Sequence, residues 1–94
     1  MAEIMEQIQN KSMNQLEFIQ FLDWSVSQWE QDGYRPEEIN NGYCVTFAKE
    51  CSEAVREAKI VKRPFHAFLK FEGLYYDAEC TEGLKDWKEL PFYQ

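Results

Sequence analysis

The chain has 94 residues, of which 45% are hydrophobic and 16% aromatic, so it can bury one hydrophobic core but hardly two. Its net charge of −7 disfavours binding to a nucleic-acid backbone or to an anionic membrane, because like charges repel one another. We therefore expect one domain over residues 1–94, with residues 1–12 as a loosely attached leader, and a protein or peptide as its substrate or partner.

Neither export nor membrane insertion is indicated by the sequence. Residues 1–10 are acidic and polar and lack the apolar run of a signal peptide, and no stretch approaches the ~20 apolar residues that span a bilayer. The three cysteines are an odd number, and without an export signal we expect them to be free thiols in a reducing compartment. The sequence therefore predicts a cytoplasmic location and no membrane partner.

The first predicted element is a long helix at about residues 13–31. Ser12 and Gln15 have the spacing of a capping box in front of this helix, and Gly33 marks its end. Acidic charge is concentrated here, because residues 1–40 carry eight acidic and two basic side chains. A solvated acidic helix face explains this charge, and an acidic docking surface is the alternative.

This helix carries more apolar residues than one buried stripe requires. One set has the spacing of a helix face that packs on a core: Ile19, Leu22, Val26 and Trp29. Three aromatic residues are left over: Phe18, Phe21 and Trp24. These three indicate either a helix that is covered on two sides or a surface for a partner.

A second helix is predicted at about residues 43–59, after the turn signal of Asn40, Asn41 and Gly42. Residues at intervals of three and four share one predicted buried face: Cys44, Ala48, Cys51, Val55 and Ala58. Cys44 therefore lies in the first turn of this helix, on its inward side.

A β-hairpin is predicted next, because two aromatic-rich segments flank a short turn. Its strands run over residues 65–71 and 74–78, and Glu72 and Gly73 form the loop between them. Residues 81–94 are predicted to fold back as a short helix or loop that closes the core. The predicted fold class is α+β, with a long N-terminal helix, a central helix that carries the cysteine, an antiparallel β-hairpin or small sheet, and an aromatic C-terminal tail.

The register of this hairpin decides which side chains meet. With a two-residue loop, Phe71 lies opposite Leu74, so that His66 lies opposite Glu79 and diagonal to Asp77. Side chains alternate along a strand, which places His66 and both carboxylates on the same face of the sheet. A slip of one residue would move the carboxylates to the other face.

Cys44, His66 and these carboxylates are the residue types of nucleophilic thiol chemistry. A helix N-terminus and a neighbouring imidazolium both stabilise a thiolate, and Cys44 is the cysteine in such a position. His66 is the only histidine and therefore the expected base, and a carboxylate behind it would fix its tautomer. Asp77 and Glu79 both qualify for that role.

Three segments resemble the core of papain-like and transglutaminase-like cysteine hydrolases: GYCVTFA opening a helix, HAFL on a strand and GLYYD on the next strand. In that superfamily a cysteine begins the central helix, a histidine begins a strand, and an Asp or Asn on a following strand orients it. The resemblance implies a minimal or degenerate member, in which Cys44, His66 and Asp77 form a triad that cleaves an amide, isopeptide or thioester bond. The family's oxyanion-donating Gln is missing, and Asn40 or Asn41 would take its place.

Other interpretations of the same residues stay open. Cys44 can be a small core hydrophobe, and His66 can be a structural histidine paired with Glu79. A zinc site from the three cysteines and the histidine is disfavoured because no C-x-x-C pair is present, so we expect no metal and no cofactor. The second candidate function is a non-catalytic acidic binding or inhibitor protein on this scaffold, which docks a protein partner.

Overall fold

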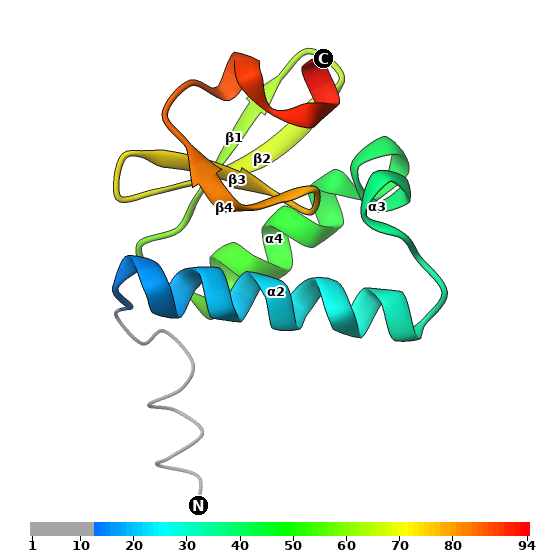
Figure 1. Cartoon of the computed structure of the whole chain (residues 1–94), viewed down its shortest axis with the longest axis horizontal. Helices are drawn as coiled ribbons and strands as arrows, with labels where there is room; N and C mark the ends of the chain where they lie inside the picture. The colour runs from blue at the N-terminus through cyan, green and yellow to red at the C-terminus, as the bar shows by residue number, and fades with distance from the viewer. Residues whose placement is uncertain (1–12) are drawn as a thin grey trace, which may run out of the picture.

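Helices occupy the first half of the described chain and strands the second half (Figure 1). The computed structural model describes residues 13–94. In chain order the elements are α2 (Gln15–Gln31), α3 (Pro36–Gly42), α4 (Cys44–Ala54), β1 (Lys59–Arg63), β2 (His66–Phe71), β3 (Leu74–Asp77), β4 (Cys80–Leu84) and the short 3₁₀ helices η1 (Trp87–Glu89) and η2 (Pro91–Tyr93). The α+β class predicted from the sequence is confirmed.

The long helix α2 begins with a capping box, two residues later than the sequence predicted. The backbone N–H of Glu17 donates to Asn14 Oδ1 at 2.8 Å, and the backbone N–H of Asn14 donates to Glu17 Oε1 at 3.0 Å. These bonds satisfy two groups that a bare helix end leaves unpaired. Ser12, which was expected to cap the helix, lies outside the described residues.

One helix was not predicted and another is shorter than predicted. Residues Asn40, Asn41 and Gly42, predicted as a turn, belong to α3, which begins at Pro36 because proline is compatible with the first turn of a helix. Helix α4 ends at Ala54 rather than near residue 59, because Val55 has an extended backbone with φ −124° and ψ 116°. The residues after it are therefore free to form β1, which the sequence analysis did not identify.

The strands form one antiparallel sheet in the order β1-β2-β3-β4. The predicted central hairpin is confirmed, with Phe71 opposite Leu74 and Lys70 opposite Tyr75. Glu72 at φ 48° and Gly73 at φ 81° form its two-residue loop, and positive φ at both positions suits the twist of the strands. Four strands replace the two that were expected, because β1 and β4 extend the hairpin on either side.

Each face of the sheet packs against a different part of the chain. Residues of α2 and α4 cover one face, where Phe18 of α2 stacks on Phe71 at 4.2 Å between ring centroids. The C-terminal tail covers the other face, where Leu90 is fully buried against Phe68. Figure 1 shows this arrangement, with the helices below the sheet and the tail above it. The predicted role of the tail in closing the core is confirmed.

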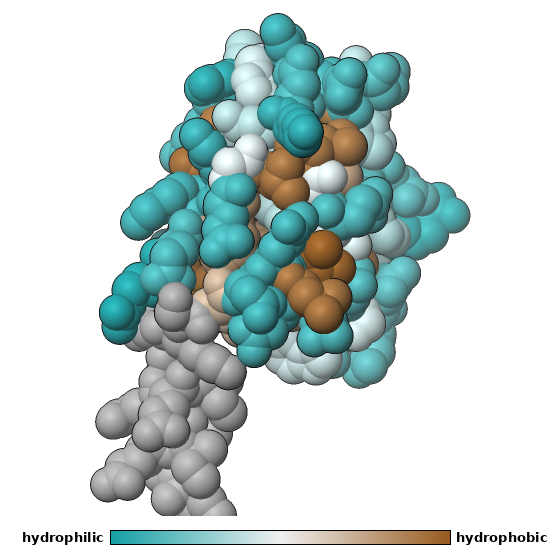
Figure 2. Space-filling model, turned by 60° about the vertical axis from the view of Figure 1, so that its left-hand side comes forward, coloured by the Kyte–Doolittle hydropathy of each residue, from teal (hydrophilic) through white to brown (hydrophobic). Residues whose placement is uncertain are grey.

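The surface is mainly hydrophilic on the face that Figure 2 presents. Apolar residues emerge there only in small separate areas between polar ones, so this face has no broad apolar patch. Within residues 13–94, no helix combines the length and the apolar character that crossing a membrane requires.

Candidate functional site

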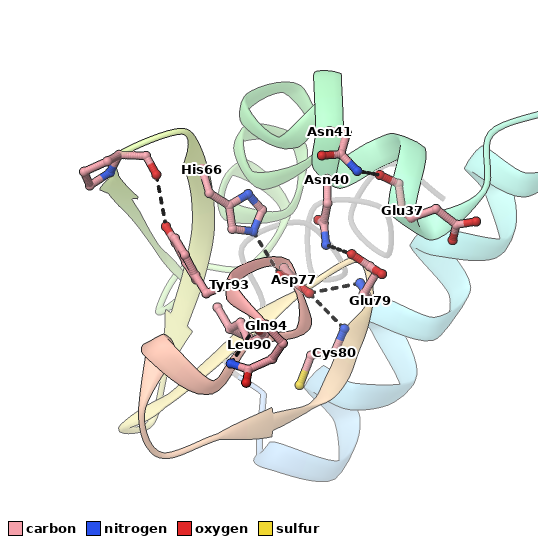
Figure 3. A network of polar contacts seen from close by, with 11 residues as sticks. Glu37, Asn40, Asn41, His66, Asp77, Glu79, Cys80, Leu90, Tyr93 and Gln94 are labelled. Carbon is pink, nitrogen blue, oxygen red and sulfur yellow. Dashed lines mark hydrogen bonds and ion pairs between the residues drawn. The ribbon is translucent and has the colours of Figure 1, made fainter.

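The imidazole of His66 and the carboxylate of Asp77 form a buried pair. His66 begins β2 and Asp77 ends β3, so the two side chains are diagonal neighbours on one sheet face, as the hairpin register predicted. His66 Nε2 lies 2.9 Å from Asp77 Oδ2, and the two side chains are 0% and 2% exposed (Figure 3). A contact of this length between buried polar groups is a strong hydrogen bond.

Backbone groups hold the Asp77 carboxylate in place. Its second oxygen, Oδ1, accepts hydrogen bonds from the backbone N–H groups of Glu79 at 3.0 Å and Cys80 at 2.9 Å. Glu79 lies in the turn between β3 and β4, and Cys80 begins β4, so this connection fixes the orientation of the carboxylate. An ionised carboxylate only accepts hydrogen bonds, so with Asp77 in that form Nε2 of His66 is the donor in this contact.

The other ring nitrogen of His66, Nδ1, is buried and has no hydrogen-bond partner among the described residues. The ring is fixed by the C-terminal tail, where Phe92 stacks on it at 4.1 Å and 15°, and Tyr93 lies edge-on at 5.9 Å. The Tyr93 hydroxyl in turn donates to the carbonyl of Pro64 at 3.4 Å. The sequence analysis placed this tail in the core but did not predict its stacking on His66.

Cys44 is the first residue of α4 and is half-buried. The partial positive charge of a helix N-terminus stabilises a thiolate at this position. Burial raises the pKa of Tyr93, the positive charge of Arg63 lowers it, and the charges of Cys44 and Asp77 raise it. No hydrogen bond joins the Cys44 thiol to the imidazole, since Nδ1 is unpaired within residues 13–94.

The other two cysteines are buried and are poor nucleophiles. Burial raises the pKa of the Cys51 thiol to about 12. Burial, followed by the Glu82 carboxylate, raises the pKa of Cys80 to about 11. Both groups therefore stay protonated near neutral pH, and of the three cysteines Cys44 has the most access to solvent.

The polar residues that sequence analysis placed beside the triad have other partners. Asn40 is buried and donates from Nδ2 to Glu79 Oε1 at 2.8 Å, and Asn41 donates from Nδ2 to the carbonyl of Glu37 at 2.7 Å (Figure 3). Of the two carboxylates that the sequence left open as partners of His66, Asp77 makes the contact. Glu79 supports it through its backbone N–H instead.

One of the three expected partner-surface residues requires a correction. Phe18 is 0% exposed, because it packs between Phe71 and Tyr76, with its ring centroid 4.9 Å from that of Tyr76. Phe18 is therefore a core residue. Trp24 is 59% exposed, and Phe21 is half-buried and lines a cavity beside it.

Comparisons with known proteins give no match. No protein-family model, no curated protein and no solved structure matches this chain. Over residues 13–94, no three His, Cys, Asp or Glu side chains gather in a group that could hold a metal ion. The arguments about function therefore depend on the side chains themselves.

Proposed function

We propose that the protein is a cysteine-dependent hydrolase or acyltransferase in which Cys44 is the nucleophile, His66 the base and Asp77 the residue that orients the base. The observation that carries the proposal is the buried His66–Asp77 pair at 2.9 Å, which leaves the lone pair of Nδ1 without a partner. A histidine that is held by a carboxylate through one nitrogen is prepared to take a proton through the other.

The reaction proceeds in two steps on these residues. Nδ1 of His66 takes the proton of the Cys44 thiol, and the thiolate attacks the carbonyl carbon of an amide, isopeptide or thioester. The bond to the leaving amine or thiol breaks as His66 returns the proton to it, and the acyl group stays on sulfur. Water, or a second nucleophile in the acyltransferase, then gives its proton to His66 and releases the acyl group. Asp77 stabilises the imidazolium at both stages.

An activated acetyl ester tests the proposal directly. Incubation with 4-nitrophenyl acetate, followed by mass spectrometry of the intact chain and of its peptides, should show one acetyl group on Cys44 that forms and is then lost. Cys44→Ala should abolish this adduct, His66→Gln should slow its formation, and Cys80→Ala is the matched cysteine control. Acetyl transfer that persists in Cys44→Ala, or that never reaches Cys44, would contradict the proposal.

The second candidate is a non-catalytic binding protein, and the complete burial of the imidazole favours it. In this candidate His66, whose side chain is 0% exposed and stacked on Phe92, has the structural role of joining β2, β3 and the tail. In that case Cys44 should react with the ester no faster in the wild type than in His66→Gln. The two candidates are therefore separated by the same experiment.

A further inference from the structure

A groove between α2, α4 and the loops at their ends contains an aromatic and acidic pocket, away from the His66–Asp77 pair. Its volume is about 440 Å³, and it is lined by Gln28, Trp29, Asp32, Tyr34, Tyr43 and Glu50. A second cavity of about 220 Å³ shares Gln28, Trp29 and Glu50 with it and continues along the helices to Phe21, Trp24 and Ala54. The two cavities are therefore neighbours, and we refer to them together as the groove.

Three aromatic rings surround one end of this groove. The centroid of Trp29 lies 5.3 Å from that of Tyr34 and 5.8 Å from that of Tyr43, and the two tyrosine rings lie 4.9 Å apart at 70°. The indole N–H of Trp29 donates to Glu50 Oε1 at 3.1 Å, which fixes the ring beside a carboxylate. The three rings meet one another edge to face or tilted and together line the pocket, and an aromatic cluster beside a carboxylate attracts a cation.

The charged residues that line the groove have one sign. Asp32 and Glu50 are the only charged residues that line the two cavities, and both are acidic. Helix α2 contains acidic residues and no basic residue along its length. The nearby Arg35 is already paired, with its Nε 3.1 Å from Glu37 and 3.7 Å from Glu38. The field in the groove therefore favours a positively charged ligand.

We propose that this groove binds an arginine side chain of a basic peptide segment in a partner protein, with an apolar neighbour of that arginine in the smaller cavity. A guanidinium group stacks on aromatic rings and donates hydrogen bonds to carboxylates in its plane, so Trp29, Tyr34 and Tyr43 recognise its face while Asp32 and Glu50 accept from its edge. Phe21, Trp24 and Ala54 provide an apolar surface for the neighbouring residue. The site depends on neither Cys44 nor His66 and therefore goes beyond the proposed function.

The tryptophan indoles provide the measurement, because two of the three lie in the groove and Trp87 packs on the opposite sheet face. The full chain, labelled with ¹⁵N, is titrated with an acetylated Arg-Leu-Arg-Leu amide, and the indole N–H signals are followed by NMR. The Trp24 and Trp29 signals should shift and saturate, the Trp87 signal should stay in place, and added salt should weaken the binding. The matched Glu-Leu-Glu-Leu peptide should cause no saturable shift.

Variants of the two carboxylates test the recognition of charge. The double variant Asp32→Asn with Glu50→Gln keeps the shape of the groove and removes its charge. It should weaken the binding of the arginine peptide about tenfold. Glu53→Gln, an exposed position on α4 outside the cavities, is the control and should bind like the wild type. An unchanged Trp87 signal in each variant confirms that the fold is intact.

Several results would overturn the proposal. These are equal shifts with both peptides, a Trp29 shift no larger than that of Trp87, or full affinity in the double variant. Indole shifts that grow with protein concentration in the absence of peptide would identify a second copy of the chain as the occupant, and they would overturn it as well.

Discussion

Replacing Asp77 by alanine removes a carboxylate that accepts three hydrogen bonds in a buried site. The donors are His66 Nε2 and the backbone N–H groups of Glu79 and Cys80, at 2.9, 3.0 and 2.9 Å. A buried donor that loses its acceptor costs about 1–3 kcal/mol, and loss of one member of a buried pair costs about 3–5 kcal/mol. We therefore expect Asp77→Ala to lower the free energy of unfolding by about 4 kcal/mol, a large part of the stability of a small domain.

Asp77→Asn separates the two kinds of contact at this position. The amide oxygen can still accept from the two backbone N–H groups, whereas the charge-assisted bond to His66 is lost, so we expect a smaller loss of about 2 kcal/mol. Urea denaturation followed by far-UV circular dichroism measures both values. Glu53→Gln on the exposed face of α4 is the control and should stay within about 0.5 kcal/mol of the wild type. A loss below about 1 kcal/mol in Asp77→Ala would refute the reasoning.

Three further predictions concern the fold. Gly83→Ala should lower the free energy of unfolding by about 2–4 kcal/mol, because the Cβ of the new alanine would lie 2.7 Å from the Tyr76 ring. Gly73→Ala also has a positive φ but has open space around it, and it should lose about 1 kcal/mol in the same urea assay. Burial raises the pKa of the Cys80 and Cys51 thiols above their ordinary 9.0, so their contribution to the free energy of unfolding should be complete below pH 9 and fall as the pH rises toward 11 and 12. A Cys51→Ala variant that loses stability just as steeply over this range would contradict the prediction. Deletion of residues 1–12 should preserve cooperative thermal unfolding, and deletion of residues 1–31 should abolish it, because Phe18 and Leu22 of α2 are fully buried.

The elements with strong local signals were predictable from the sequence. The spacing of apolar residues predicted α2 and the burial of Ala48 and Cys51 on α4. The turn residues Glu72 and Gly73 predicted the central hairpin and its register. That register in turn predicted the contact between His66 and Asp77, because side chains on neighbouring strands meet only in one alignment. The sequence left Phe18 open between a covered second face and a partner surface, because helical periodicity cannot show that the sheet covers that face.

Other features depend on tertiary structure that no local pattern reveals. Strand β1 is rich in lysine and arginine because it lies at the edge of the sheet, and β4 contains Gly83 because Tyr76 fills the space of a side chain. Phe92 stacks on His66 although the two residues are 26 positions apart in the sequence. In the aromatic pocket, the turn after α2 brings the ring of Tyr34 against that of Trp29. The acidic and aromatic composition of the N-terminal half was visible in the sequence, but the pocket that combines them was not.

The rate at which iodoacetamide alkylates Cys44 in the wild type and in His66→Gln tests the proposed pairing of the thiol with the imidazole most directly. Near pH ~6 an ordinary thiol is almost fully protonated and reacts slowly, so rapid alkylation there reports a thiolate that the imidazolium stabilises. Cys51 and Cys80 serve as internal references in the same peptide map, because both are buried. We predict that wild-type Cys44 reacts far faster than either reference and that His66→Gln, with an unchanged circular dichroism spectrum, slows it at least about tenfold. Equal Cys44 rates in the two proteins would contradict the proposed triad.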